Sequence, residues 1–277
     1  MDLAELAIEL AVGCGVGFTI GLTGVGGGVL VIPALTVILG MPATTAVGTA
    51  SAYAFLTKVY AGFEHWRLRT IDFRLANLFL LGAIPGNIAA CLAIGAVKQR
   101  ASDPAALAAF QAQLTAFIAG VMIFSVILML ANLARDWMGD RRGSDRPETP
   151  TSTDLPLHRR LVSIGLGALI GAILGATSVG GGVIIVPLLI VVFGLSASRT
   201  VGTSIYLALI LTLVTSILSA GRGDVDYQVA GLMAVGSMVG VFFGSRLAVR
   251  LPERMLQGAV VVLLLVAIAA MLLKQGH

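Results

Sequence analysis

Charged residues are scarce in this chain, and their scarcity indicates the class of protein. Only 12% of the 277 residues are charged, whereas a soluble domain carries about 25%. Hydrophobic residues make up 57% of the chain, and its mean hydropathy is +0.98. The sequence therefore predicts an integral membrane protein. Its apolar stretches suit helices of roughly 20 residues, and no alternating pattern of about ten residues indicates a β-barrel.

Residues that build metal centres and nucleotide sites are also scarce. The two cysteines, Cys14 and Cys91, lie in apolar sequence, where we interpret them as small packing residues. The three histidines fall in loops or at the terminus, so no membrane-embedded metal centre is expected. No lysine follows a glycine, which excludes a phosphate loop of the G-x-x-x-x-G-K-[ST] type. We expect no enzyme, no cofactor and no metal, and any active transport must use an ion gradient or a partner.

The basic start that is typical of a signal peptide is absent as well, so the first hydrophobic segment is expected to be retained. The sequence predicts an all-α polytopic protein with about eight to ten hydrophobic segments in total. The second segment of each half is too short to span a membrane and is expected to be broken or re-entrant. The predicted segments are 5–22, 29–40, 43–63, 75–97 and 107–133, then 161–176, 183–195, 198–220, 227–249 and 255–273.

The strongest positive feature is a phrase that occurs twice. The first glycine phrase, residues 23–33, reads TGVGGGVLVIP, and the second, residues 177–187, reads TSVGGGVIIVP. The two are 154 positions apart (177 − 23), and Val47-Gly48-Thr49 recurs as Val201-Gly202-Thr203 at the same offset. This ungapped agreement indicates an internal repeat. We therefore divide the chain into a first transmembrane repeat (1–134), a polar cytoplasmic linker (135–158) and a second transmembrane repeat (159–277).

Basic residues predict how the two repeats face. The net charge is +4 and the pI is 9.4, but the basic residues lie mostly between hydrophobic segments, which favours membrane topology over nucleic-acid binding. The arginine-rich linker and the loop with Arg67, Arg69 and Arg74 are expected inside. The equivalent loop of the second repeat holds Arg222 beside two aspartates and fits the outside, which makes the repeats inverted. Lys98 and Arg100 fall outside in this scheme.

Each glycine phrase could bind a small anion. Consecutive glycines let backbone N–H groups point into a shared concavity. Ile32 and Val186 precede proline and are expected to be extended, while Pro33 and Pro187 suit the first position of a helix. Two helix N-termini would then converge near the midplane, where their partial positive charge favours an anion. The predicted binding residues of the phrases are Thr23, Gly24, Val25, Gly26, Gly27, Gly28, Thr177, Ser178, Val179, Gly180, Gly181 and Gly182.

Small hydroxyl residues follow each phrase. Thr49, Ser51, Thr203 and Ser204 are predicted either to line the cavity or to bond their own helix carbonyls. Candidates for charge or gating roles are Lys58, Tyr53, Tyr206 and Arg199; Lys58 could also extend along the helix to the cytoplasmic surface.

Other repeated residues have a structural interpretation. Glycines spaced four apart are predicted to pack helices tightly: Gly13, Gly17 and Gly21, with Gly167, Gly171 and Gly175. Asp72 and Asp226 are predicted to cap helices rather than carry protons. Glu5 and Glu9 are expected near the entry of the first helix.

With its paired phrases, each followed by V-G-T, the chain resembles the TauE/SafE family of sulfite exporter-like permeases over both repeats. This resemblance implies a multi-pass transporter of the bacterial inner membrane that exports sulfite, sulfoacetate or a related sulfonate. It also implies protons as the coupling ion. The ungapped duplication of the phrases leads to the hypothesis of alternating access, and the expected partners are the small anion and the lipid bilayer. A permease for another small carboxylate-type anion and a passive anion channel remain alternatives.

Overall fold

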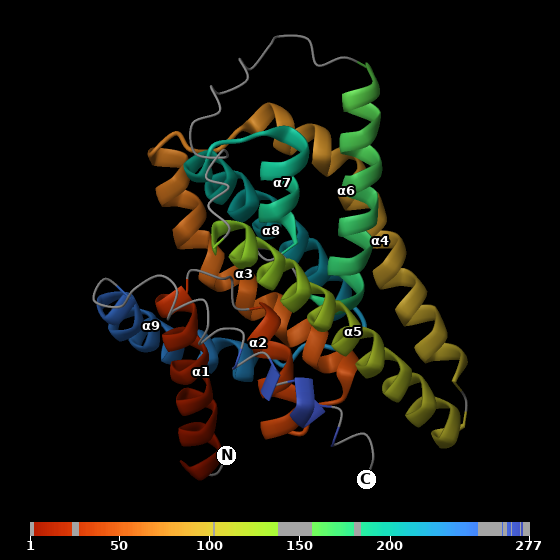
Figure 1. Ribbon diagram of the computed structural model, residues 1–277. Helices are drawn as coiled ribbons and strands as arrows, with labels where there is room; N and C mark the ends of the chain where they lie inside the picture. Colours follow the sequence, from red (N-terminus) through yellow and green to blue (C-terminus); the bar gives the residue numbers. More distant parts are fainter. Residues whose placement is uncertain are drawn as a thin grey trace.

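The computed structural model describes residues 3–23, 28–101, 103–137, 157–179 and 184–248, together with 262, 265–266, 268–271 and 273. These residues form helices and no strands (Figure 1). The described elements are α1 (Leu3–Thr23), α2 (Gly28–Pro33), the π-helix η1 (Ala34–Ile38), α3 (Ala43–Arg67), α4 (Phe73–Arg100), α5 (Pro104–Trp137), α6 (Leu157–Thr177), α7 (Ile185–Phe193), α8 (Ala197–Ala220) and α9 (Tyr227–Ala248).

Five of the described helices are long and apolar enough to cross a membrane. Many of their large apolar side chains are exposed, which is the arrangement that lipid favours. The predicted all-α polytopic membrane fold is therefore confirmed. The five spans are Phe73–Arg100, Pro104–Leu128, Arg160–Thr177, Arg199–Ala220 and Tyr227–Gly244.

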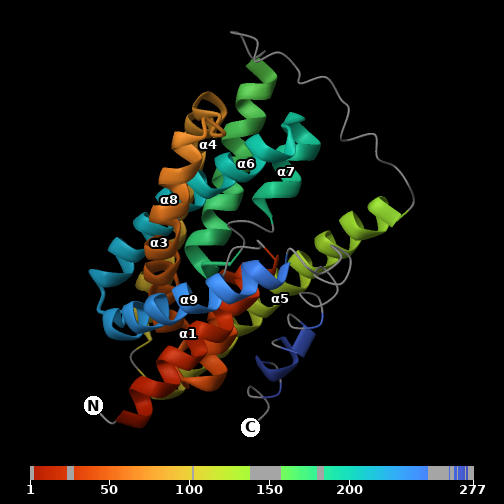
Figure 2. The ribbon, with the colours of Figure 1, turned by 90° about the vertical axis from the view of Figure 1, so that its left-hand side faces the viewer.

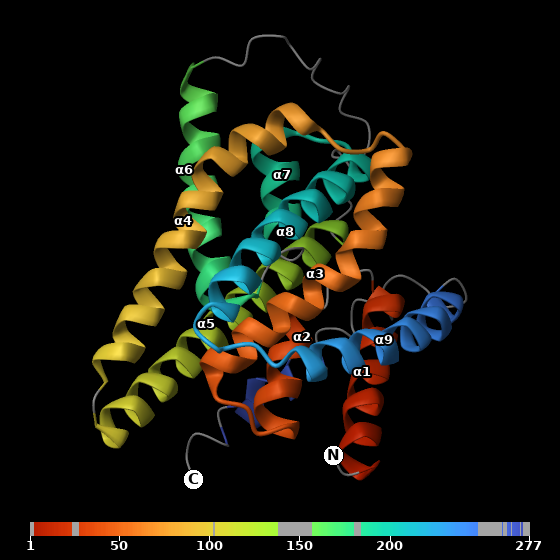
Figure 3. The same cartoon turned by 180° about the vertical axis from the view of Figure 1, so that it is seen from behind.

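The two repeats run in opposite directions. The offset of 154 pairs α1 with α6, α3 with α8 and α4 with α9. In Figure 1, α1 rises from the N-terminus, whereas its equivalent α6 descends from the opposite end of the molecule. Seen from behind, α3 and α8 lie together at the centre and run in opposite directions (Figure 3). The predicted inversion agrees with this arrangement.

The repeats are interlocked rather than side by side. Helix α1 of the first repeat packs along α9 of the second, and α4 of the first packs along α6 of the second. Figures 1 and 2 show the α4–α6 pair and the α1–α9 pair on different sides of the central helices α3 and α8. The polar linker that separates the repeats in sequence lies largely outside the described residues, since α5 extends to Trp137 and α6 begins at Leu157.

Glycines explain why these helix pairs approach so closely. A Cβ atom at Gly17 of α1 would lie 2.3 Å from the Ser237 carbonyl oxygen of α9. Its equivalent, Gly171 of α6, faces the Ala83 carbonyl oxygen of α4 at 2.0 Å. No side chain fits at such distances, so the backbones touch directly. The packing prediction is confirmed for five of the six glycines, and for Gly21 no neighbour is described: the five are Gly13, Gly17, Gly167, Gly171 and Gly175.

The prolines of the two phrases do not begin helices, and that prediction is wrong. Pro33 is the last residue of α2, and Pro187 is the third residue of α7, so Ile32 and Val186 are helical rather than extended. Pro187 is tolerated because the first four N–H groups of a helix have no intrahelical partner. After Pro33 the helix widens into η1, which fits the π-type adjustment that often follows a disturbed hydrogen-bond ladder.

The two aspartates cap helices, as predicted. The Asp72 carboxylate accepts the Leu75 amide at 3.1 Å, and the Asp226 carboxylate accepts the Val229 amide at 3.0 Å. Glu9, in the second turn of α1, is buried. Helix α9 packs along α1.

Candidate functional site

The centre of the molecule is built where α3 and α8 meet the opposite repeat. Gly48 of α3 faces the turn before α9, where a Cβ atom would lie 2.1 Å from the Asp224 carbonyl oxygen. Gly202 of α8 faces the turn before α4 in the same way, with Thr70 Oγ1 at 2.5 Å. The glycine of each V-G-T motif therefore admits the backbone of the other repeat.

The threonine of each motif completes this joint. Thr49 Oγ1 accepts a hydrogen bond from the Asp226 amide at 3.0 Å, and Thr203 Oγ1 accepts one from the Asp72 amide at 3.0 Å. Both threonines are fully buried. Neither alternative from the sequence, cavity lining or a bond to the residue's own helix, anticipated this contact. The two threonines join the repeats across the pseudo-twofold axis.

Two residues after Thr49, the first repeat meets the second glycine phrase. Ser51 Oγ donates a hydrogen bond to Ser178 Oγ at 2.8 Å, and both side chains are buried. These two residues are 127 positions apart in the chain, yet both were predicted to bind substrate. The structure thus brings together two members of the candidate site, one from each repeat. Ser204 instead donates to the Val201 carbonyl of its own helix at 2.9 Å.

The backbone at Ser178 is unusual and ends α6. Its φ angle is 51°, in the left-handed region that residues other than glycine rarely adopt. Thr177 Oγ1 supports this geometry by accepting the Val179 amide at 3.1 Å and donating to the Ile173 carbonyl at 2.7 Å. A strained serine at the helix end aims its hydroxyl at Ser51, and such strain is concentrated at functional sites.

With the exception of Gly28, the glycines of the two phrases lie outside the described residues. This applies to Gly24, Val25, Gly26 and Gly27, and to Gly180, Gly181 and Gly182. Thr23 ends α1 and Gly28 begins α2, while buried Val179 connects Ser178 to the second run. The structure therefore places the residues that border both runs. Helix α2 begins at Gly28, directly after the first run, and α7 begins at Ile185, close to the second.

The candidates for charge or gating roles occupy different places. Tyr53 of α3 is fully buried, and its hydroxyl has no hydrogen-bond partner among the described residues. Tyr206 of α8 packs edge-on against Phe73, with ring centroids 5.2 Å apart. Lys58 is half-buried two turns beyond Ser51 on α3, and Arg199 is half-buried in the first turn of α8. Of these four candidates, only Tyr53 is fully buried.

A buried polar cluster beside the site was missed by sequence reasoning. Asn87 of α4 and Thr215 of α8 exchange two hydrogen bonds, at 2.9 and 3.1 Å. Cys91 donates from Sγ to the Gly175 carbonyl at 3.3 Å, close to the end of α6 that holds Ser178. The cysteine was interpreted as plain packing. The available signal was Asn87, an amide in the middle of an apolar segment, because polar groups within a span need partners.

The central site is rich in hydroxyl and amide groups, and its residues at the α3–α6 contact are uncharged. Serine and threonine hydroxyls each offer one donor that can rotate toward a partner. Such donors suit an anion with several acceptor oxygens. Among the described residues, no group of three His, Cys, Asp or Glu side chains could hold a metal ion.

Comparisons with known proteins agree with a transporter. The family model described as "Sulfite exporter TauE/SafE" matches residues 9–271. The Bacillus subtilis protein named "Probable membrane transporter protein YjnA" is 34% identical over 260 residues, which cover 93% of this chain and 96% of that protein. The Bacillus subtilis "Probable membrane transporter protein YdhB" is 28% identical over 93% of this chain and 95% of its own length. No solved structure gives a significant match.

Proposed function

Because this chain belongs to the sulfite exporter TauE/SafE family of membrane transporters, we propose that it exports a small sulfur-containing anion through its central hydroxyl-lined site. The substrate class is sulfite, sulfoacetate or a related sulfonate, and the membrane is the bacterial inner membrane. The observation that carries the proposal is the Ser51–Ser178 hydrogen bond, which joins α3 of one repeat to the glycine phrase of the other.

The chemistry of the site fits an oxyanion. A sulfonate presents three acceptor oxygens, and each of the Ser51 and Ser178 hydroxyls can turn its proton toward one of them. The glycine phrases that adjoin Ser178 and Thr23 would supply backbone N–H groups, which bind anions without any side chain in the way. Hydrogen bonds to a charged acceptor are stronger than neutral ones, so few donors suffice.

The interlocked repeats suggest which parts move. Helices α1 and α9 touch through glycines, and so do α4 and α6, although each pair combines both repeats. Packed backbones resist sliding, so each pair would move as one unit. Alternating access would then come from motion of the α1–α9 and α4–α6 pairs about the central helices α3 and α8. The proton gradient is the proposed energy source, since the sequence has no phosphate loop.

A thermal-shift panel on the purified protein tests the substrate class. Sulfite, sulfoacetate, other sulfonates and carboxylates are compared at matched salt concentration. We expect the sulfur oxyanions to raise Tm in a concentration-dependent way, because a ligand that binds only the folded state stabilises it. A larger shift with carboxylates would identify a permease for that class instead.

Substitutions in the phrases test the location of the site. Gly27→Val and Gly181→Val should abolish the shift with sulfite while the protein still folds in detergent. Gly15→Val is the matched control, because nothing lies within 4 Å of a Cβ atom at Gly15. Unchanged binding in both phrase variants contradicts the proposed site. Flux that follows the anion gradient ohmically, without a proton dependence, indicates a passive channel.

A further inference from the structure

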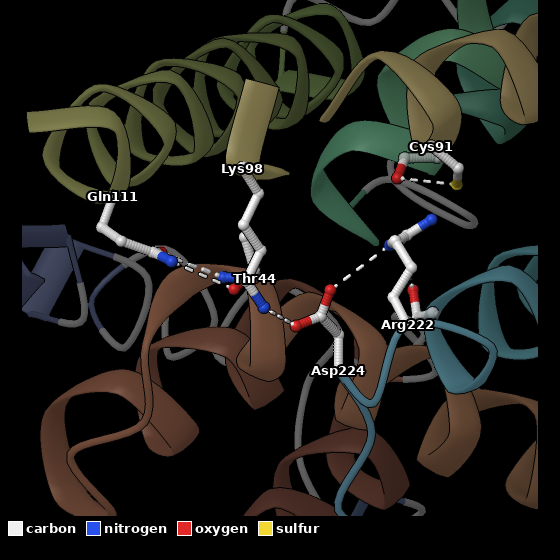
Figure 4. A network of polar contacts seen from close by, with 8 residues as sticks. Thr44, Cys91, Lys98, Gln111, Arg222 and Asp224 are labelled. Atoms are coloured by element: carbon white, nitrogen blue, oxygen red, sulfur yellow. Dashed lines mark hydrogen bonds and ion pairs between the residues drawn. The ribbon is translucent and has the colours of Figure 1, made fainter. Parts of the chain in front are cut away.

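A group of three charged side chains lies at one end of the central helices (Figure 4). Asp224, in the turn between α8 and α9, forms salt bridges with Lys98 of α4 and with Arg222 of its own turn. The Asp224 side chain is only 2% exposed, and Arg222 Nε lies 3.3 Å from Asp224 Oδ2. Arg222 Nη2 also donates to Ser219 Oγ at 3.1 Å. We call Lys98, Arg222 and Asp224 the charged triad.

The repeat architecture does not require this triad. The residues of the first repeat that are equivalent to Arg222 and Asp224 are Leu68 and Thr70 (offset 154), and neither is charged. A buried ion pair stabilises a fold weakly, because desolvation offsets most of the attraction. The chain also keeps a glycine beside it, since a Cβ atom at Gly95 would lie 2.8 Å from Arg222 Cδ. Two cations share a single carboxylate, so the triad carries a net positive charge.

The triad is connected to the central site along two routes. The Asp224 carbonyl lies against Gly48 of α3, three residues before Ser51. The Arg222 side chain points toward Cys91 in Figure 4. The Cys91 thiol in turn donates to the Gly175 carbonyl, three residues before Ser178. Contacts therefore lead from the triad to the two segments that hold Ser51 and Ser178.

We propose that Lys98 and Arg222 form an access site for the transported oxyanion at the face that the loop charges predict to be outside, where an exported anion leaves the protein. The anion there displaces the Asp224 carboxylate from the two cations. A guanidinium binds sulfonate or sulfite oxygens with the same paired N–H groups that bind a carboxylate. Asp224 thus acts as a built-in competitor that closes this end of the molecule by joining α4 to the α8–α9 turn. The inference rests on the proposed transport function and names residues outside the central site.

Exchange kinetics in proteoliposomes test this inference, with radiolabelled sulfite as the probe and KM measured for sulfite that enters from the face of the triad. The Arg222→Gln variant should raise KM about tenfold, because one charge-assisted hydrogen bond to the anion is exchanged for a neutral one. The Asp224→Asn variant should lower KM, because the competitor loses its charge. The Lys98→Gln variant should raise KM. It should also fold like the wild type, since the Lys98 side chain is 32% exposed. The matched control is Arg67→Gln, an exposed arginine at the end of α3, which should leave KM unchanged.

The opposite signs for Asp224→Asn and Arg222→Gln separate an access site from a structural ion pair. A structural role predicts that both variants lose Tm and active protein together, with KM unchanged, and that result overturns the inference. Wild-type KM in all three triad variants overturns it as well. Failure of the wild-type protein to bind or move sulfite or any other anion of the panel contradicts the transport function itself, which is a distinguishable result.

Discussion

The hydroxyl oxygen of Thr49 accepts a hydrogen bond from the backbone amide of Asp226, and the hydroxyl oxygen of Thr203 accepts one from the amide of Asp72. Both bonds are 3.0 Å long. Each threonine belongs to one repeat and each amide to the other. Adding 154 to Thr49 and Asp72 gives Thr203 and Asp226, so the two bonds are equivalent. They lie about the pseudo-twofold axis at the centre of the molecule. Several expected outcomes depend on this interlocked centre.

Removing either threonine hydroxyl should destabilise the protein. Thr49→Val and Thr203→Val each leave a partly buried amide without its acceptor, which costs about 1 kcal/mol. Tm in detergent should fall by a similar amount in both variants, because the two environments are equivalent. Thr49→Ser and Thr203→Ser keep the hydroxyl and serve as controls. A drop in only one of the two valine variants would contradict the equivalence.

Substitutions of Ser178, whose backbone is left-handed, should affect stability and sulfite binding separately. Ser178→Gly should be more stable than Ser178→Ala by about 1 kcal/mol, because glycine adopts a positive φ without strain. Ser178→Ala keeps the strain and loses the hydroxyl, so no gain is expected. Both variants lack the hydroxyl that bonds to Ser51, and both should lose affinity for sulfite in the thermal-shift assay. Retained sulfite binding in both would remove Ser178 from the site.

Glycine crossings between the repeats should tolerate no side chain. Gly17→Leu and Gly171→Leu would place a Cβ atom 2.3 and 2.0 Å from a backbone oxygen of the facing helix. We expect little or no folded protein in detergent by size-exclusion chromatography. Gly15→Ala and Gly165→Ala are matched controls on the same helices, because each position has open space. These controls should fold normally, since alanine favours a helix more than glycine does. Failure of the controls would show that these helices tolerate no substitution of glycine, whether or not a neighbour lies close.

The buried pair of Asn87 and Thr215 should show measurable coupling. A double-mutant cycle with Asn87→Ala and Thr215→Val isolates the energy of their two hydrogen bonds. Side-chain hydrogen bonds within membranes average about 0.6 kcal/mol and reach about 1.7 kcal/mol. We expect a coupling energy in this range from unfolding titrations. Strict additivity of the two single variants would show that the pair contributes nothing to stability.

Sequence reasoning predicted the class, the repeat and the packing glycines because each depends on local composition or on a fixed spacing. Apolar length alone predicts membrane helices, and small residues four apart share one helix face. The capping aspartates were also predictable, since an N-cap contacts an amide three residues later. The proline prediction was wrong because proline restricts the residue before it without excluding a helix.

Partners that are far apart in sequence could not be found in this way. The V-G-T motif was visible twice, yet nothing local indicates that Thr49 bonds to Asp226 or that Gly48 admits a turn of the other repeat. Lys98 illustrates the same limit. Its position conflicted with the expected charge bias of the loops, and only the folded chain reveals Asp224 as its counter-ion.

The sequence by itself determined that this protein is helical, membrane-embedded, duplicated and a member of a transporter family, since composition, period and motif are all properties of the linear chain. Only the tertiary structure decided that helices of one repeat pack along helices of the other, that Ser51 bonds to Ser178, and that Lys98 and Arg222 share one carboxylate. The physical reason is that membrane helices associate through close backbone packing and polar contacts between distant segments. Those contacts are specified by shape in three dimensions.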